Sequence, residues 1–119
     1  MEYQKYLPYI NAAEGLGRVG NNLKLYTRLL KLFLADGHLP LVDAAARAAN
    51  YPDAAAQAHA IKGAAANLSL SRAYEDALAL EQCFKAGGGG YEPLFLALHN
   101  SMAETFDNIY RFVQEAETV

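Results

Sequence analysis

The sequence predicts an all-α protein, an antiparallel up-and-down four-helix bundle with one or two short accessory helices. No stretch shows the alternation of apolar and polar residues, bounded by hairpin turns, that is typical of strands. Alanine, the strongest helix former, is abundant. Four amphipathic segments of roughly 15 to 25 residues are joined by short breaks, and such segments bury their apolar stripes together as antiparallel neighbours.

Three helical segments are expected in the first fifty residues, over about 2–13, 21–35 and 40–50. The first ends at a group of closely spaced glycines. Asn21 or Asn22 can cap the second, since asparagine side chains accept hydrogen bonds from free helix N–H groups. Pro40 occupies the first turn of the third, where its missing N–H is tolerated. We expect the first and third segments to cover the ends of the bundle.

Three longer helices are expected in the rest of the chain, beginning at about Pro52, at Ser69 or Ser71, and at Tyr91 or Glu92. The middle helix has one stripe to bury, formed by Tyr74, Ala77, Leu78, Glu81 and Phe84. Four consecutive glycines at 87–90 impose a large conformational cost on any helix, so they predict a loop.

Length and composition predict one folded domain over residues 1–119. A chain of 119 residues can bury a single core, but it is too short for a catalytic domain beside a nucleotide-binding domain. With 53% hydrophobic and 19% charged residues, the chain is not expected to be disordered. Gly15, Gly17 and Gly20 spell G-x-G-x-x-G, but no strand precedes them. We therefore interpret them as loop glycines and expect no ATP site.

Charge and cysteine content restrict the partners. A net charge of −3 with scattered basic residues argues against nucleic acid. No apolar run approaches the ~20 residues of a membrane-spanning helix, so we expect no membrane association and a cytoplasmic, monomeric protein. The single cysteine, Cys83, agrees with a reducing compartment. Three isolated histidines and one cysteine show no paired ligand spacing, so no metal site is expected.

The most informative segment is 58–68, where a histidine, a lysine and a glycine share one stripe of a predicted helix. Residues three, four and seven apart lie on one helical face, which places His59, Lys62, Gly63 and Ala66 together. His59 falls at the edge of the apolar face rather than within it. A glycine inside a helix costs ~1 kcal/mol relative to alanine, so Gly63 indicates the close approach of another backbone.

This segment resembles the histidine phosphotransfer (HPt) domain. The signature of that family is a phosphorylatable histidine followed by lysine and glycine at the third and fourth places, in a small-residue helix that ends near a Leu-Gly pair. Here His59, Lys62, Gly63 and Leu68 match, with Ser69 where the family often has glycine. The stretch 15–30 also looks like the segment that opens the first long helix of these domains, so the resemblance covers almost the whole chain.

The resemblance implies a phosphorelay intermediate. His59 would accept a phosphoryl group on Nε2 from the aspartate of a receiver domain and pass it to another receiver. A neutral imidazole is a nucleophile at neutral pH, and Lys62 offers positive charge to the phosphoryl oxygens. No carboxylate cluster flanks His59, so the chain has no cofactor of its own and Mg²⁺ would come from the partner receiver.

Partners and rival interpretations follow from the same residues. The expected partners are response-regulator receiver domains and a hybrid sensor histidine kinase, docking on Gly63, Ala66 and Asn67, although Asn67 could simply face water. Two alternatives are a docking or regulatory module that binds a receiver or kinase without phosphorylation, and the phosphoacceptor domain of a chemotaxis-type kinase. His38 is interpreted as a solvated loop residue, and His99 as a residue of the last helix that belongs to no motif. Arg72 and Lys85 are interpreted as solvated charges rather than docking residues, although Arg72 lies near the end of the motif helix and could face an acidic receiver.

Overall fold

The computed structural model describes residues 1–118, in which every regular element is helical. The elements are η1 (Gln4–Tyr6), α1 (Ala12–Arg18), α2 (Leu23–Phe33), α3 (His38–Arg47), α4 (Tyr51–Leu68), α5 (Ser71–Lys85) and α6 (Tyr91–Glu117). The predicted all-α class is confirmed. Asn22 caps α2 by accepting a hydrogen bond from the Leu25 N–H at 3.0 Å, as predicted. The glycines at 87–90 form the loop between α5 and α6.

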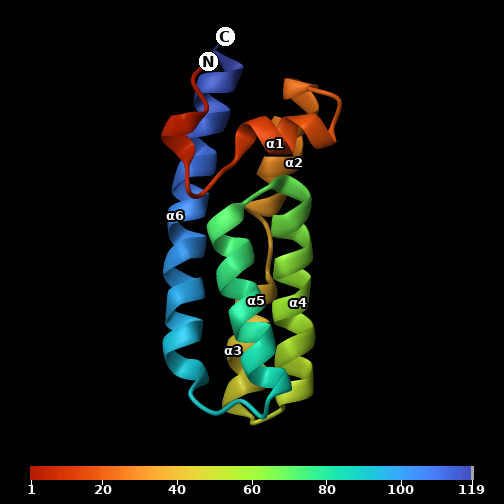
Figure 1. The fold of residues 1–119 in the computed structure, drawn as a ribbon, viewed down its shortest axis with the longest axis vertical. Helices are drawn as coiled ribbons and strands as arrows, with labels where there is room; N and C mark the ends of the chain where they lie inside the picture. The colour runs from red at the N-terminus through yellow and green to blue at the C-terminus, as the bar shows by residue number, and fades with distance from the viewer. Residues whose placement is uncertain (119) are drawn as a thin grey trace.

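Three sides of the bundle are single helices, and the fourth is built from two. Helices α4, α5 and α6 run antiparallel to their chain neighbours, while α2 and α3 follow one another behind them (Figure 1). Helix α4 packs against α3 and α5, α5 packs against α6, and α2 contacts both α4 and α6. The bundle is elongated, with principal extents of 47 × 22 × 20 Å.

The expectation that the third helix covers an end of the bundle is wrong. Helix α2 has 11 residues and α4 has 18. At 1.5 Å of rise per residue, α2 is only about two-thirds as long as α4. The chain breaks at 34–37 and α3 then continues the same side of the bundle against α4. Two short helices thus bury what one long helix would have buried.

The predicted helix over residues 2–13 is also wrong. Its place is taken by the single turn of η1, an irregular link, and then α1, which Asn11 caps by accepting from the Glu14 N–H. Pro8 cannot donate a backbone hydrogen bond inside a helix, which disfavours a continuous element. Tyr6 instead packs edge-on against Phe112 of α6, with ring centroids 5.1 Å apart.

Helix α1 runs through Gly15 and Gly17, so these residues are not loop glycines. A methyl group at Gly15 would overlap the ring of Tyr26, which is fully buried. The Tyr26 hydroxyl donates a hydrogen bond to the carbonyl of Leu68 at 2.7 Å. Glycine at position 15 therefore lets Tyr26 reach the end of α4.

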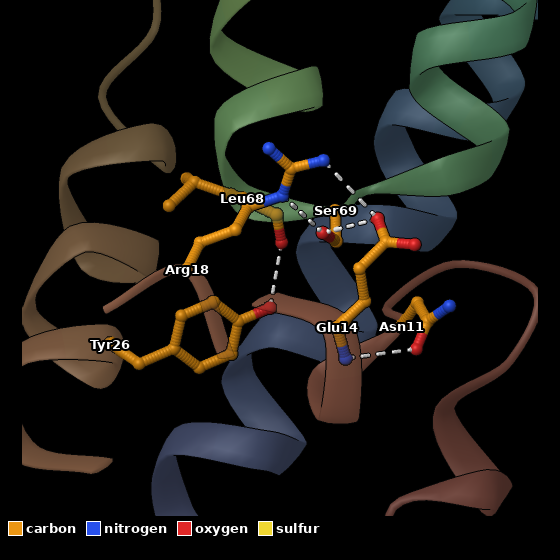
Figure 2. A network of polar contacts seen from close by, with 6 residues as sticks. All are labelled: Asn11, Glu14, Arg18, Tyr26, Leu68 and Ser69. Atoms are coloured by element: carbon orange, nitrogen blue, oxygen red, sulfur yellow. Dashed lines mark hydrogen bonds and ion pairs between the residues drawn. The ribbon is translucent and has the colours of Figure 1, made fainter. Parts of the chain in front are cut away.

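The C-terminal end of α4 is closed by Ser69, not by glycine. Ser69 lies in the left-handed region, with φ 57° and ψ 42°, the conformation that glycine adopts most easily. Its hydroxyl donates to Glu14 at 2.7 Å and accepts from Arg18 Nε at 3.3 Å (Figure 2). The prediction that Ser69 or Ser71 caps α5 is wrong, because Leu70 holds that position without a side-chain cap. The polar contacts tie α1 to the end of α4.

Candidate functional site

His59 lies on the outer side of α4, as its place in the helical repeat predicted. Its side chain is 63% exposed. Ala58, Ile61 and Ala65, on the neighbouring face of the helix, are fully buried. The core contacts of these residues hold α4 against its neighbours and leave the imidazole at the surface.

A buried carboxylate on α5 lies directly against His59. The Glu81 side chain is 2% exposed, and its Oε2 atom lies 2.7 Å from Nδ1 of His59. Lys62 Nζ lies 2.6 Å from Oε1 of the same carboxylate, and Lys85 Nζ lies 3.2 Å from Oε2. Glu81 thus joins a histidine and two lysines, drawn from two helices, in one cluster.

The cluster keeps Glu81 ionised. Burial raises the pKa of this carboxyl, but hydrogen bonds and ion pairs from Lys62, His59 and Lys85 outweigh burial and lower the pKa to about 2. An ionised carboxylate can only accept hydrogen bonds, so Nδ1 of His59 carries the proton in this contact. In the neutral imidazole, Nε2 then retains its lone pair. The ring is held in the tautomer whose free nitrogen is Nε2.

The net charge of the cluster is positive when the imidazole is neutral. One carboxylate faces the ammonium groups of Lys62, whose side chain is only 21% exposed, and of Lys85, whose side chain is 65% exposed. The surface around His59 therefore suits an anionic group. The sequence predicted that Lys85 is a solvated charge; its side chain is largely exposed, and it also forms an ion pair with Glu81 that the sequence did not reveal.

Gly63 faces open space. No atom of the described chain, beyond its own helix and neighbours, lies within 4 Å of the position that a Gly63 Cβ would occupy. The sequence predicted that another backbone lies close to Gly63, and no other part of residues 1–118 does so. Ala66 lines a shallow groove beside the start of α5, and Asn67 is exposed and lines a second groove beside α2.

The remaining histidines lie away from this cluster. The expectation that His38 lies in a loop is wrong, because it is the first residue of α3. Its side chain is 42% exposed, as expected of a solvated residue, and its Nδ1 contacts the largely buried carboxylate of Asp36. His99 is exposed on α6 and stacks on Phe95, with centroids 6.4 Å apart. Arg72 forms only a long ion pair, 3.9 Å, with Glu75.

No three histidine, cysteine, aspartate or glutamate side chains of residues 1–118 are grouped closely enough to hold a metal ion. Within the same range, no helix combines the length and apolar character needed to cross a bilayer.

The fold and the cluster together define a small helical-bundle protein that presents an oriented imidazole on a positively charged surface. The family model of the Hpt domain matches residues 28–110, a range that contains His59, Lys62, Glu81 and Lys85. The chain belongs to the Hpt domain family, and membership implies histidine phosphotransfer in phosphorelays. Comparisons with curated proteins and with solved structures gave no significant match.

Proposed function

We propose that this protein is a phosphorelay intermediate whose phosphoacceptor is Nε2 of His59. The observation that carries the proposal is the contact between the buried Glu81 carboxylate and Nδ1 of His59, at 2.7 Å. This contact orients an exposed ring and leaves one nitrogen free beside two lysines. The phosphoryl donor and acceptor would be aspartates of two receiver domains, one of them belonging to a hybrid sensor histidine kinase.

In the proposed transfer, the Nε2 lone pair attacks the phosphorus of an aspartyl phosphate. The N–P bond forms as the P–O bond to the aspartate breaks, and the bonding electrons return to the aspartate carboxylate. No proton has to leave Nε2 first, because the proton of the neutral ring is on Nδ1. Positive charge that develops on the ring is stabilised by Glu81. The reverse reaction with a second receiver completes the relay.

Lys62 and Lys85 would stabilise the phosphoryl oxygens during transfer. Phosphoryl transfer depends more on positioning and charge stabilisation than on covalent help from the protein. Both ammonium groups contact the same carboxylate that contacts His59, so both are near the reacting ring. In this proposal Mg²⁺ belongs to the receiver and is needed there for its own phosphoaspartate.

The docking surface that we propose consists of Gly63, Ala66 and Asn67. The open space at Gly63 supports it, because a receiver backbone can approach α4 there without meeting a side chain. Ala66 adds no bulk one turn further along the helix. The exposed amide of Asn67 can hydrogen-bond to the partner.

The test is transfer of radioactive phosphate from a set of phosphorylated receiver domains. We expect wild-type protein to gain a label that is stable to base and labile to acid, and His59→Gln to gain none while retaining wild-type helix content. His38→Gln and His99→Gln are matched controls and should be labelled normally. Label that persists on His59→Gln would refute the assignment, and binding of receivers without any labelling would favour a docking-only module.

A further inference from the structure

Three basic side chains of α2 gather in a groove beside the C-terminal end of α6. The groove has a volume of about 300 Å³, and its wall includes Lys24, Arg28 and Lys31 of α2 together with Glu117 of α6. Figure 1 shows α2 and the last turns of α6 at the same end of the bundle. The three basic residues are exposed and lie four and three positions apart, so they form one stripe along two turns of α2. We call this surface the basic groove.

The basic groove and His59 lie at opposite seams of the bundle. Helix α4 packs against α5, and His59 and Glu81 meet at that seam. Helix α2 packs against α6, and the basic groove lies at that second seam. A molecule bound in the basic groove therefore leaves the imidazole uncovered.

The positive charge of the basic groove is only partly balanced. Lys31 Nζ lies 2.6 Å from Oε2 of Glu117, whereas Lys24 and Arg28 form no ion pair within residues 1–118. Three cations and one carboxylate give the groove a charge of +2, while the whole chain carries −3, so the rest of the molecule carries −5. The basic groove is thus a positive surface on a negative molecule, and it suits an anionic group supplied from outside.

The contacts within the basic groove favour a carboxylate of a protein as that anionic group. Glu117 already places a carboxylate against Lys31, and both side chains are about half exposed. Exposed ion pairs contribute little stability, so a second carboxylate can join or replace Glu117 at small cost. Half-buried Leu25 also lines the groove and adds apolar surface next to the cations. A nucleic acid or an anionic bilayer would instead bring many charges against the negative remainder of the molecule.

We propose that the basic groove binds an acidic segment of a partner protein, whose carboxylates contact Lys24, Arg28 and Lys31. Lys24 and Lys31 are seven residues apart, about 10 Å along the axis of α2 at 1.5 Å per residue. A partner helix with acidic residues at positions i, i+4 and i+7 has the same spacing. The proposal adds a binding activity that does not depend on phosphotransfer, and such a partner holds the protein while His59 remains open to receivers.

The test is binding of a labelled synthetic peptide helix with glutamate at i, i+4 and i+7, measured by fluorescence anisotropy. A second peptide with glutamine at these three positions is the neutral comparison. The double substitution Lys24→Gln with Arg28→Gln removes the two unpaired cations. Its matched control is Arg47→Gln with Arg111→Gln, which changes the net charge equally and removes exposed arginines that pair within their own helices.

We expect the wild type to bind the glutamate peptide in preference to the glutamine peptide, with an affinity that falls as salt is added. The Lys24 and Arg28 double variant should bind about tenfold more weakly, since two charged contacts are lost, and its control should bind within about twofold of wild type. Glu117→Gln should bind about threefold more tightly because Lys31 becomes available, whereas Glu92→Gln, an equal charge change elsewhere on α6, should have no such effect.

Three outcomes would overturn the proposal. Equal weakening in the two double variants would mean that affinity follows net charge rather than the basic groove. Equal affinity of the wild type for the two peptides, or no binding of either, would remove the role of the carboxylates. Tighter binding of a duplex oligonucleotide or of phosphatidylserine vesicles than of the glutamate peptide, lost in the Lys24 and Arg28 double variant, would exclude an acidic protein segment as the preferred occupant.

Discussion

Replacing Glu81 by glutamine tests whether the buried carboxylate organises the site. Glutamine has nearly the same shape and keeps one oxygen that can accept the Nδ1–H of His59. The substitution removes the negative charge that Lys62 and Lys85 share. The change therefore isolates the charge of Glu81 from its volume.

The expected loss of stability follows from the pKa of Glu81. Its pKa falls from 4.5 to about 2 in the folded protein. A difference of roughly 2.5 units at 1.36 kcal/mol each corresponds to about 3 kcal/mol at neutral pH. The amide retains some hydrogen bonding, so we expect Glu81→Gln to lower the free energy of unfolding by about 2 kcal/mol. In a protein of this size that loss lowers the melting temperature by roughly 8 °C.

The pH dependence provides the sharper test. A carboxyl whose pKa is lowered by folding stabilises the protein fully above its unfolded pKa, and this stabilisation disappears as the pH falls through the folded pKa. The contribution of Glu81 to the free energy of unfolding should thus be complete above about pH 4.5. It should fall to less than half of its full value by about pH 3 and be absent below about pH 2.

The difference in free energy of unfolding between wild type and Glu81→Gln is measured by urea denaturation at a series of pH values from 7 to 3, with circular dichroism as the signal. Other carboxyls with lowered pKa values, such as Glu115, titrate in both proteins and cancel. The stability gap should narrow steadily below pH 4.5. A gap of constant size across this range, or no gap at pH 7, would refute the account of Glu81 as an ionised counter-charge.

Two further substitutions separate chemistry from docking. In single-turnover measurements, Lys62→Ala should slow phosphate transfer about tenfold and shorten the lifetime of the phosphohistidine. Its free energy of unfolding should fall by only about 1 kcal/mol, because Lys85 still contacts Glu81. The exposed control is Lys24→Ala, and a wild-type transfer rate in Lys62→Ala would mean that Lys62 serves only as a counter-ion of Glu81. Gly63→Gln should raise stability by several tenths of a kcal/mol, since the position is helical and open, yet reduce receiver binding and transfer. A more stable Gly63→Gln protein that transfers phosphate at the wild-type rate would contradict the docking role.

Local signals in the sequence predicted the helices whose ends are set locally. Asparagine caps, proline in a first turn and consecutive glycines act within a few residues, and α2, α4 and α6 begin within one or two residues of the expected positions. The N-terminal segment was mispredicted because its conformation depends on a distant contact. Tyr6 is placed by its packing on Phe112, about a hundred positions further along the chain.

The candidate site was only half predictable for a similar reason. His59, Lys62 and Gly63 lie within one helix, so helical spacing alone places them together. Glu81 belongs to another helix, and the spacing within α4 does not determine which face of α5 it meets. A signal was nevertheless present, because Glu81 occupies the stripe that α5 was predicted to bury, and a carboxylate at a core position requires cationic partners.

The sharing of two lysines by one carboxylate has a thermodynamic consequence under the proposed function. A phosphoryl group on His59 must compete with Glu81 for the same ammonium groups. Its net electrostatic stabilisation is therefore reduced by the free energy needed to weaken the ion pairs of Glu81 with these lysines. If Lys62 turns to the phosphate, Lys85 and His59 still contact the carboxylate, and no buried charge is left isolated. The phosphohistidine is therefore only weakly stabilised by this site. Its free energy stays close to those of the donor and acceptor phosphoaspartates, so that phosphate can be transferred in either direction.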